Sequence, residues 1–252
     1  MSEANISEKE LELIPPESMI FIGLGDFKQI GDHFFRLFVE YGYLKPEHLV
    51  LDIGCGLGRM ARPLTQYLKN GGEYWGIDIV KDAINWCNQE YSPRYPNFHF
   101  QVSDIYNKVY NPLGQDQAAE YKLPYEDESF DFVFLTSVFT HMFLPDINNY
   151  LAEISRVTKS GGISFITFFI LETESLIKMI LDQSSLKFKH EIEGGLTIDS
   201  EFPESAIAFK LELVREMYEK YHFTIEEPIH YGVWSGRENG ISYQDIIIAR
   251  KQ

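Results

Sequence analysis

One stretch constrains the fold of this chain more than any other: residues 50–59, which read VLDIGCGLGR. An apolar run that ends in three glycines at alternate positions predicts a buried strand, followed by a turn whose backbone approaches a ligand closely. A helix is expected next, over 59–70, where apolar residues recur at helical spacing before Gly71-Gly72. The stretch therefore predicts strand, glycine turn and helix, which is the first unit of a nucleotide-binding α/β sheet.

The spacing of the glycines narrows the choice of nucleotide. A dinucleotide fingerprint, G-x-G-x-x-G/A, requires a small residue where this chain has Arg59, so Gly54, Gly56 and Gly58 fit it poorly. Asp52 lies two residues before the first glycine, at an apolar strand end where a carboxylate requires a donor or a cation. This pattern resembles the first motif of class I S-adenosylmethionine-dependent methyltransferases. The resemblance implies that the glycines admit the cofactor and that Asp52 helps to order the site around its amino-acid end.

An acidic residue near the end of the second strand extends the resemblance. The strand is predicted over 73–80 and carries Asp78, 20 residues after Gly58, where an acid can accept both ribose hydroxyl protons. The resemblance also implies a cofactor contact from Ile79, the residue after Asp78. The alternative for Asp78 is an N-cap of the helix predicted over 81–90, a role that Asp82 could also fill.

The third strand, predicted over 97–105, ends in Ser103-Asp104-Ile105. In the family that the chain resembles, this position implies that Asp104 reaches the adenine amino group, while the neighbouring backbone and Ile105 hold the ring. On its own, an Asp at a strand end is a cap or a turn residue.

The region around the fourth strand contains the candidate catalytic residue. Residues 106–122 are expected to form a long surface loop, and the acidic turn and Phe130-Asp131 that follow are typical of the fourth strand of this family. The strand runs into Thr136 and His141, where the resemblance implies that the methyl sulfonium and the acceptor meet. We interpret His141 as a general base for an alcohol, phenol or amine acceptor. The alternative is a hydrogen-bonded structural histidine.

The resemblance covers about residues 46–171 and implies an α/β, Rossmann-like sheet of seven strands, mostly parallel with the last strand antiparallel, and with helices on both faces. We expect a tail and a leading helix or flap over 1–45, and a methyltransferase domain over 46–252 with an insertion or cap near 184–209. The other predicted elements are helices over 29–43, 146–159, 173–183 and 211–221, strands over 163–170, 224–234 and 242–250, and an irregular segment over 184–209.

Composition limits the classes of partner. A net charge of −16, from 38 acidic and 22 basic residues, repels phosphate backbones, so nucleic acid is not an expected partner. The acidic start lacks the features of a secretory signal, and the longest apolar run, over 163–171, is too short to span a bilayer. Cys55 and Cys87 provide neither a disulfide framework nor a zinc motif. We therefore expect a cytoplasmic protein with two buried thiols, no membrane association and no required metal.

The leading interpretation is methyl transfer from S-adenosyl-L-methionine to a small-molecule acceptor, with an O-, N- or C-nucleophile left open. One alternative is a catalytically silent protein that binds the cofactor or acts as a scaffold. Another is aminopropyl transfer, which would require paired acids where this chain has Thr136, Ser137 and His141. A separate hypothesis is that Trp234 to Arg237 binds an anionic acceptor; its alternative is a core Trp234 and a solvated Arg237.

Overall fold

The computed structural model describes residues 13–20 and 25–252. Its centre is a seven-stranded sheet in the order β10-β11-β5-β4-β1-β2-β3. Strands β3, β2, β1, β4 and β5 pair in parallel, and the last strand, β11, is antiparallel to both of its neighbours. The predicted fold class is confirmed, including the antiparallel last strand.

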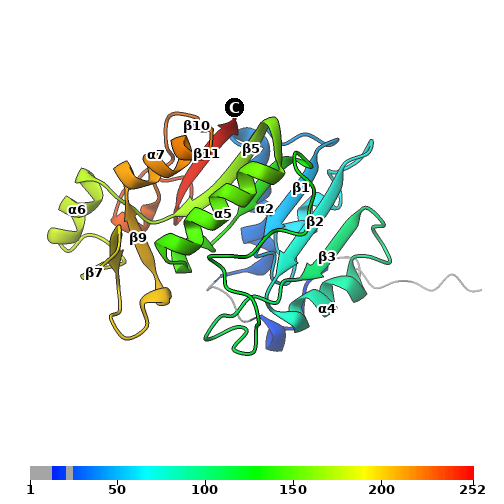
Figure 1. The fold of residues 1–252 in the computed structure, drawn as a ribbon, viewed down its shortest axis with the longest axis horizontal. Helices are drawn as coiled ribbons and strands as arrows, with labels where there is room; N and C mark the ends of the chain where they lie inside the picture. Colours follow the sequence, from blue (N-terminus) through cyan, green and yellow to red (C-terminus); the bar gives the residue numbers. More distant parts are fainter. Residues whose placement is uncertain (1–12, 21–24) are drawn as a thin grey trace, which may run out of the picture.

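The strands of this sheet are β1 (Leu49–Ile53), β2 (Glu73–Asp78), β3 (Phe98–Val102), β4 (Phe130–Leu135), β5 (Thr158–Phe168), β10 (Phe223–Ile225) and β11 (Asp245–Lys251). The helices are α2 (Phe27–Glu40), α3 (Ala61–Leu64), α4 (Lys81–Glu90), α5 (Leu144–Val157), α6 (Thr173–Ile180) and α7 (Leu211–Lys220), with short 3-10 turns η1 (Glu17–Met19), η2 (Phe139–His141), η3 (Pro203–Ser205) and η4 (Val233–Ser235). Helix α5 covers one face of the sheet and α2 lies behind the other (Figure 1).

Alternation along the central strands builds a core on each face. Val50 of β1 joins the cluster that contains α2 and α4 side chains, whereas Leu51 joins the cluster that contains α5 and α7 side chains. In β4, Phe132 and Phe134 belong to the first cluster, and the intervening Val133 belongs to the second. Successive side chains of a strand point to opposite faces, so an unbroken apolar run suits a strand covered on both sides.

Helix α2 is fixed at its start and along its buried face. The Asp26 carboxylate accepts a hydrogen bond from the Gln29 N–H at 2.7 Å, which satisfies one of the free donors of the first turn. Phe38 is fully buried, and its ring centroid lies 4.5 Å from that of Phe134 and 4.9 Å from that of Phe165. These contacts hold α2 against the sheet, with its first turn beside the carboxyl ends of the strands.

Two predicted elements are less than half as long as expected. The helix predicted over 59–70 is regular only over Ala61–Leu64, because the backbone changes to the tighter i+3 bond from Tyr67 N–H to Leu64 C=O. The strand predicted over 224–234 ends at Ile225, three residues before Pro228, which has no N–H for a ladder bond.

Residues 184–209, expected to be irregular, contain most of a second sheet. Its order is β6-β9-β8-β7, formed by β6 (Ile170–Leu171), β7 (His190–Ile192), β8 (Gly195–Thr197) and β9 (Ile207–Lys210). The sequence analysis missed these strands because they are only two to four residues long. With α6, this sheet forms one end of the molecule, opposite β3 and α4 (Figure 1).

The tail expected at the start of the segment 1–45 lies mostly outside the described residues, although Leu13 is buried in the core. Within residues 13–20 and 25–252, no helix combines the length and the apolar character that crossing a membrane would require.

Candidate functional site

A cavity of about 970 Å³ opens at the carboxyl ends of β1 to β4. Residues that end or follow these strands line it, among them Asp52, Asp78, Ile105 and Thr136. Open α/β sheets bind ligands at this edge, and the volume lies near the top of the roughly 300–1,000 Å³ range of small-molecule sites. The cavity is therefore large enough for a nucleotide-sized ligand together with a second small molecule.

The glycine turn after β1 forms one wall of the cavity. Gly54 and Gly56 line it with positive φ angles of 84° and 51°. A Cβ atom on Gly54 would lie 2.4 Å from the Val138 side chain, so no larger residue fits there. Gly58, the third glycine of the motif, lies outside the lining, and its carbonyl accepts a 2.9 Å hydrogen bond from the Tyr91 hydroxyl. The third glycine thus packs against α4's end rather than facing the cavity.

Asp78 connects the glycine turn to the second strand. Its Oδ2 accepts the Gly56 N–H at 2.7 Å, and its Oδ1 accepts the Val80 N–H at 2.8 Å. Burial raises the pKa of Asp78, against the opposing effect of these backbone donors. The N-cap of α4 is Val80, without a side-chain cap bond, so neither Asp78 nor Asp82 occupies that position. Asp78 lines the cavity beside Ile79, and its oxygens retain lone pairs for further donors.

Asp52 is the most unusual carboxylate of the cavity wall. It is 1% exposed; its Oδ2 accepts the Tyr74 hydroxyl at 2.6 Å, while its Oδ1 has no hydrogen-bond partner among residues 13–20 and 25–252. Burial raises the pKa of Asp52 to about 8, the Tyr74 hydrogen bond opposes the rise, and the charge of Asp78 adds to it. A buried carboxylate oxygen without a partner is costly. A ligand group with a donor or a positive charge would satisfy it.

Replacing Asp52 should make protein stability less dependent on pH. The folded-state pKa of about 8 lies above the usual value of about 3.9, so the folded protein holds the extra proton between these limits. The stability that the protonated Asp52 contributes is fully present below about pH 4 and is lost as the pH rises through 8. Between pH 5 and pH 8, the unfolding free energy of Asp52→Asn should therefore rise relative to that of the wild type by about a few kcal/mol. Urea unfolding across this range measures it, and a constant difference would contradict a neutral buried Asp52.

His141 lies in η2, directly after β4, and lines the same cavity. Its Nδ1 is 2.7 Å from the backbone carbonyl oxygen of Glu204. A carbonyl only accepts, so Nδ1 carries the hydrogen and the lone pair of the neutral ring is on Nε2. Thr136 also lines the cavity, and the N–H of Ser137, the next residue, donates to Thr167 Oγ1 at 2.7 Å.

Of the two candidate residues after β3, the structure places Ile105 in the cavity wall but not Asp104. Ser103 and Ile105 line the cavity, whereas Asp104 is exposed and lies outside the lining. Alternate residues of an extended chain point to opposite sides, so the inward position falls on the two neighbours of Asp104. The backbone carbonyl of Asp104 instead accepts the N–H groups of Gln115 and Asp116, each at 2.9 Å, and fixes the following loop.

Two segments far apart in the sequence complete the cavity wall. Phe27, which the sequence analysis considered for a flap, lies there with Ile30 on α2. Ser242 and Gln244 approach from the turn before β11, and Gln244 Nε2 donates to Ser137 Oγ at 2.9 Å. No motif marked the residues of the 242–244 turn, because their role depends on a contact across more than 100 residues.

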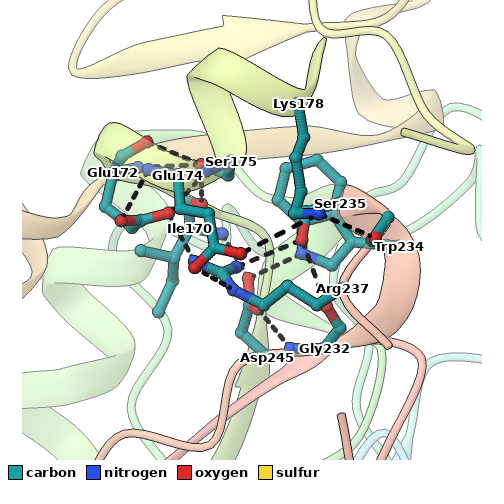
Figure 2. A network of polar contacts seen from close by, with 11 residues as sticks. Ile170, Glu172, Glu174, Ser175, Lys178, Gly232, Trp234, Ser235, Arg237 and Asp245 are labelled. Carbon is teal, nitrogen blue, oxygen red and sulfur yellow. Dashed lines mark hydrogen bonds and ion pairs between the residues drawn. The ribbon is translucent and has the colours of Figure 1, made fainter. Parts of the chain in front are cut away.

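The hypothesis of an anion site at Trp234 to Arg237 is wrong. The Arg237 Nη2 lies 2.6 Å from Glu172 Oε1, and its Nε lies 3.2 Å from Glu174 Oε2 (Figure 2). The guanidinium is therefore already paired with these two carboxylates. Trp234 is fully buried, and its Nε1 donates to Asp245 Oδ2 at 2.8 Å. Trp234 is a core residue, as the alternative stated, but Arg237 is in a half-buried ion pair rather than solvated.

Arg237→Ala should destabilise the fold without affecting the cavity. It removes the Arg237 ion pair of the partly buried Glu172, whose carboxylate keeps the N–H groups of Glu174 and Ser175, and we expect a loss of about 2 kcal/mol in the unfolding free energy. The matched control is Arg250→Ala, which removes a more exposed pair with Glu226 and should cost less than about 1 kcal/mol. Equal losses in denaturant unfolding would contradict a special role for the Arg237 pair.

Comparison with known proteins agrees with this geometry. A family model described as "Methyltransferase domain" matches residues 51–166. The sterol 24-C-methyltransferase ERG6B of Gibberella zeae is 28% identical over 153 residues, which are 61% of this chain and 36% of that protein. The chain thus spans about a third of that relative's length.

Solved structures share the fold. The PH0226 protein of Pyrococcus horikoshii matches with a TM-score of 0.60 and 20% identity, over 93% of this chain and 95% of that one. The magnesium protoporphyrin IX methyltransferase of Synechocystis, solved with bound S-adenosylhomocysteine, matches with a TM-score of 0.55 and 17% identity, over 93% and 92%.

Proposed function

We propose that the chain transfers a methyl group from S-adenosyl-L-methionine to a small-molecule acceptor, as a member of the class I S-adenosylmethionine-dependent methyltransferase family. The observation that carries the proposal is the buried, unpartnered Asp52 oxygen, which shares one cavity with the glycine turn and Asp78. S-adenosylmethionine has an ammonium group that suits this oxygen and ribose hydroxyls that suit Asp78. The residues present therefore fit the cofactor that the family uses.

The cofactor-binding roles follow from the residues on the cavity wall. Asp52 would accept from the amino-acid end, Asp78 would accept from the ribose, and Gly54 and Gly56 would admit the ligand close to the backbone. We assign apolar contacts to the cofactor to Ile79 and Ile105, and a polar contact to Thr136. Gly58 and Asp104 receive supporting roles, because both lie outside the lining.

When bound, S-adenosylmethionine supplies an electrophilic methyl group on a sulfonium. The protein's contribution to such a displacement is mostly alignment of the two reactants, which the shared cavity supports. We assign to His141 the removal of the acceptor's proton through Nε2, for a hydroxyl or amine nucleophile. The Glu204 carbonyl would hold the ring in the tautomer that leaves Nε2 free to accept.

The second sheet and its loops would complete the acceptor side of the site. Glu204, which lies between β8 and β9, lines the cavity and holds His141, so we propose that the segment 184–209 acts as a cap. The two free, buried cysteines, Cys55 and Cys87, suit a reducing compartment, and we propose a cytoplasmic protein.

A labelled-methyl assay tests the function. Purified protein is incubated with S-adenosylmethionine labelled on the methyl group and with a bacterial metabolite extract, and small-molecule, protein and nucleic-acid fractions are separated. The proposal expects label in the small-molecule fraction, and none when the site is blocked by Gly56→Val. Cofactor binding without transfer to any fraction would favour a silent binding protein, and label only on macromolecules would contradict a small-molecule acceptor.

A further inference from the structure

The loop over residues 106–116 has a defined shape, because its polar groups bond to each other. The Asn107 side-chain oxygen accepts the N–H groups of Val109 and Tyr110 at 3.0 and 2.9 Å. The backbones of Asn107 and Asn111 exchange two hydrogen bonds of 3.0 Å. Asparagine side chains that bond to their own following backbone are typical of built turns. The loop is thus a formed structure that presents the remaining side chains in fixed places.

Four of the side chains that this loop exposes are apolar or aromatic, and they lie among the exposed polar side chains of Lys108, Gln115 and Asp116. Exposed fractions are 45% for Tyr106, 70% for Val109, 47% for Tyr110 and 82% for Leu113. Single exposed apolar residues are ordinary, but several on one short loop mark a surface that another molecule covers. A molecule that covers these side chains removes apolar surface from water, which favours its binding.

The apolar loop is continuous with the cavity. Tyr106 and Tyr110 belong both to the exposed surface and to the cavity lining. Across the opening, the half-exposed Phe202 carries the Lys108 ammonium 4.8 Å from its ring centroid, and Glu204 two residues later lines the cavity. The mouth of the cavity therefore lies between the loop and the segment that holds His141.

We propose that the acceptor is an amphiphilic small molecule whose nucleophilic end enters the cavity and whose apolar tail lies on Tyr106, Val109, Tyr110 and Leu113. That the ligand is a methyl acceptor rests on the proposed function, whereas the binding surface is inferred from the exposed residues of the loop alone. The continuity of the patch with the cavity favours one ligand that occupies both. A net charge of −16 opposes docking of an anionic membrane or a nucleic acid on the same surface.

A homologous series of n-alkyl 4-hydroxybenzoates, from the methyl to the nonyl ester, tests this surface by titration calorimetry. Each methylene that leaves water should tighten binding by two- to fourfold, the upper figure corresponding to ~0.8 kcal/mol. In the double variant Val109→Ser/Leu113→Ser, the nonyl ester should bind at least tenfold more weakly than in the wild type. The methyl ester, which is too short to reach Val109 and Leu113 outside the cavity lining, should bind equally to both.

The matched control is Ile177→Ser/Ile180→Ser, which removes two comparably exposed residues, 49% and 83%, from α6. It should bind every ester as the wild type does. Equal chain-length dependence in all three proteins, equal losses in both variants or no binding of any ester would overturn the inference. S-adenosylhomocysteine is titrated into each protein separately, and the ester series is run with and without it. If S-adenosylhomocysteine does not bind, the proposed function is contradicted, while the ester series without it still tests the binding surface.

Discussion

His141→Ala should lower kcat by about 10²- to 10⁴-fold, the usual contribution of a positioned general base, while S-adenosylhomocysteine affinity stays unchanged. The structure motivates this expectation with two observations. His141 lines the cavity, and its Nδ1 is engaged by the Glu204 carbonyl, so Nε2 is the nitrogen that can accept a proton. The measurement is steady-state kinetics with an acceptor from the labelled-methyl assay, together with calorimetric titration of S-adenosylhomocysteine.

His33→Ala is the matched control for this prediction. The His33 ring also lies within hydrogen-bond distance of a backbone carbonyl, 2.8 Å from Ile241 O, but it lies outside the cavity lining. Removing it should change kcat far less than removing His141. A wild-type kcat in His141→Ala, or an equal loss of kcat in both variants, would show that His141 is not the general base.

Asp78→Ala should weaken S-adenosylhomocysteine binding by roughly 1–3 kcal/mol, which is about five- to 150-fold in Kd. The loss has two physical sources. On the proposed assignment, the variant lacks an acceptor for two ribose hydroxyls. It also leaves the Gly56 and Val80 N–H groups without their carboxylate partner, so the glycine turn is held less firmly. Calorimetry at one pH measures the difference directly.

Asp104→Ala provides the control for Asp78→Ala. Both aspartates end or follow neighbouring parallel strands, but the Asp104 side chain is exposed and outside the lining. Its removal should leave the Kd within about twofold, a difference of ~0.4 kcal/mol. An Asp104 variant that binds as poorly as the Asp78 variant would restore the adenine contact that the sequence implied. Unchanged affinity in the Asp78 variant would remove the ribose assignment.

The order of the fold was predictable because its signals are local. Val50 and Leu51 are adjacent apolar residues that must both be buried, which requires a sheet covered on two faces, and the glycines that follow mark the ligand edge. The antiparallel direction of the last strand, in contrast, was predicted only from the family resemblance. The two-residue strand β6 and the three- and four-residue strands of the same sheet had no such signal, since Gly194-Gly195 reads equally well as a loop.

The candidate site was predictable where a single strand end sets the side chain. Asp52, Asp78 and Thr136 reach the cavity from the ends of β1, β2 and β4, as their positions suggested. Asp104 did not, because a one-residue difference in an extended chain reverses the direction of the side chain.

Pairings across long sequence separations were beyond the sequence patterns. The contact of Gln244 with Ser137, and the capture of Arg237 by Glu172, each join segments more than 60 residues apart. Nothing in the residues around Arg237 indicates which carboxylate is its neighbour.

Calorimetric titration of the wild-type protein with S-adenosylhomocysteine tests whether the cavity at the ends of β1 to β4, with its glycine turn and the unpartnered Asp52 oxygen, is the cofactor site. We expect one site per chain, lost in Gly56→Val, whose side chain would stand where the turn has a positive φ angle. No heat of binding in the wild type, or equal binding in Gly56→Val with an intact fold by circular dichroism, would contradict it.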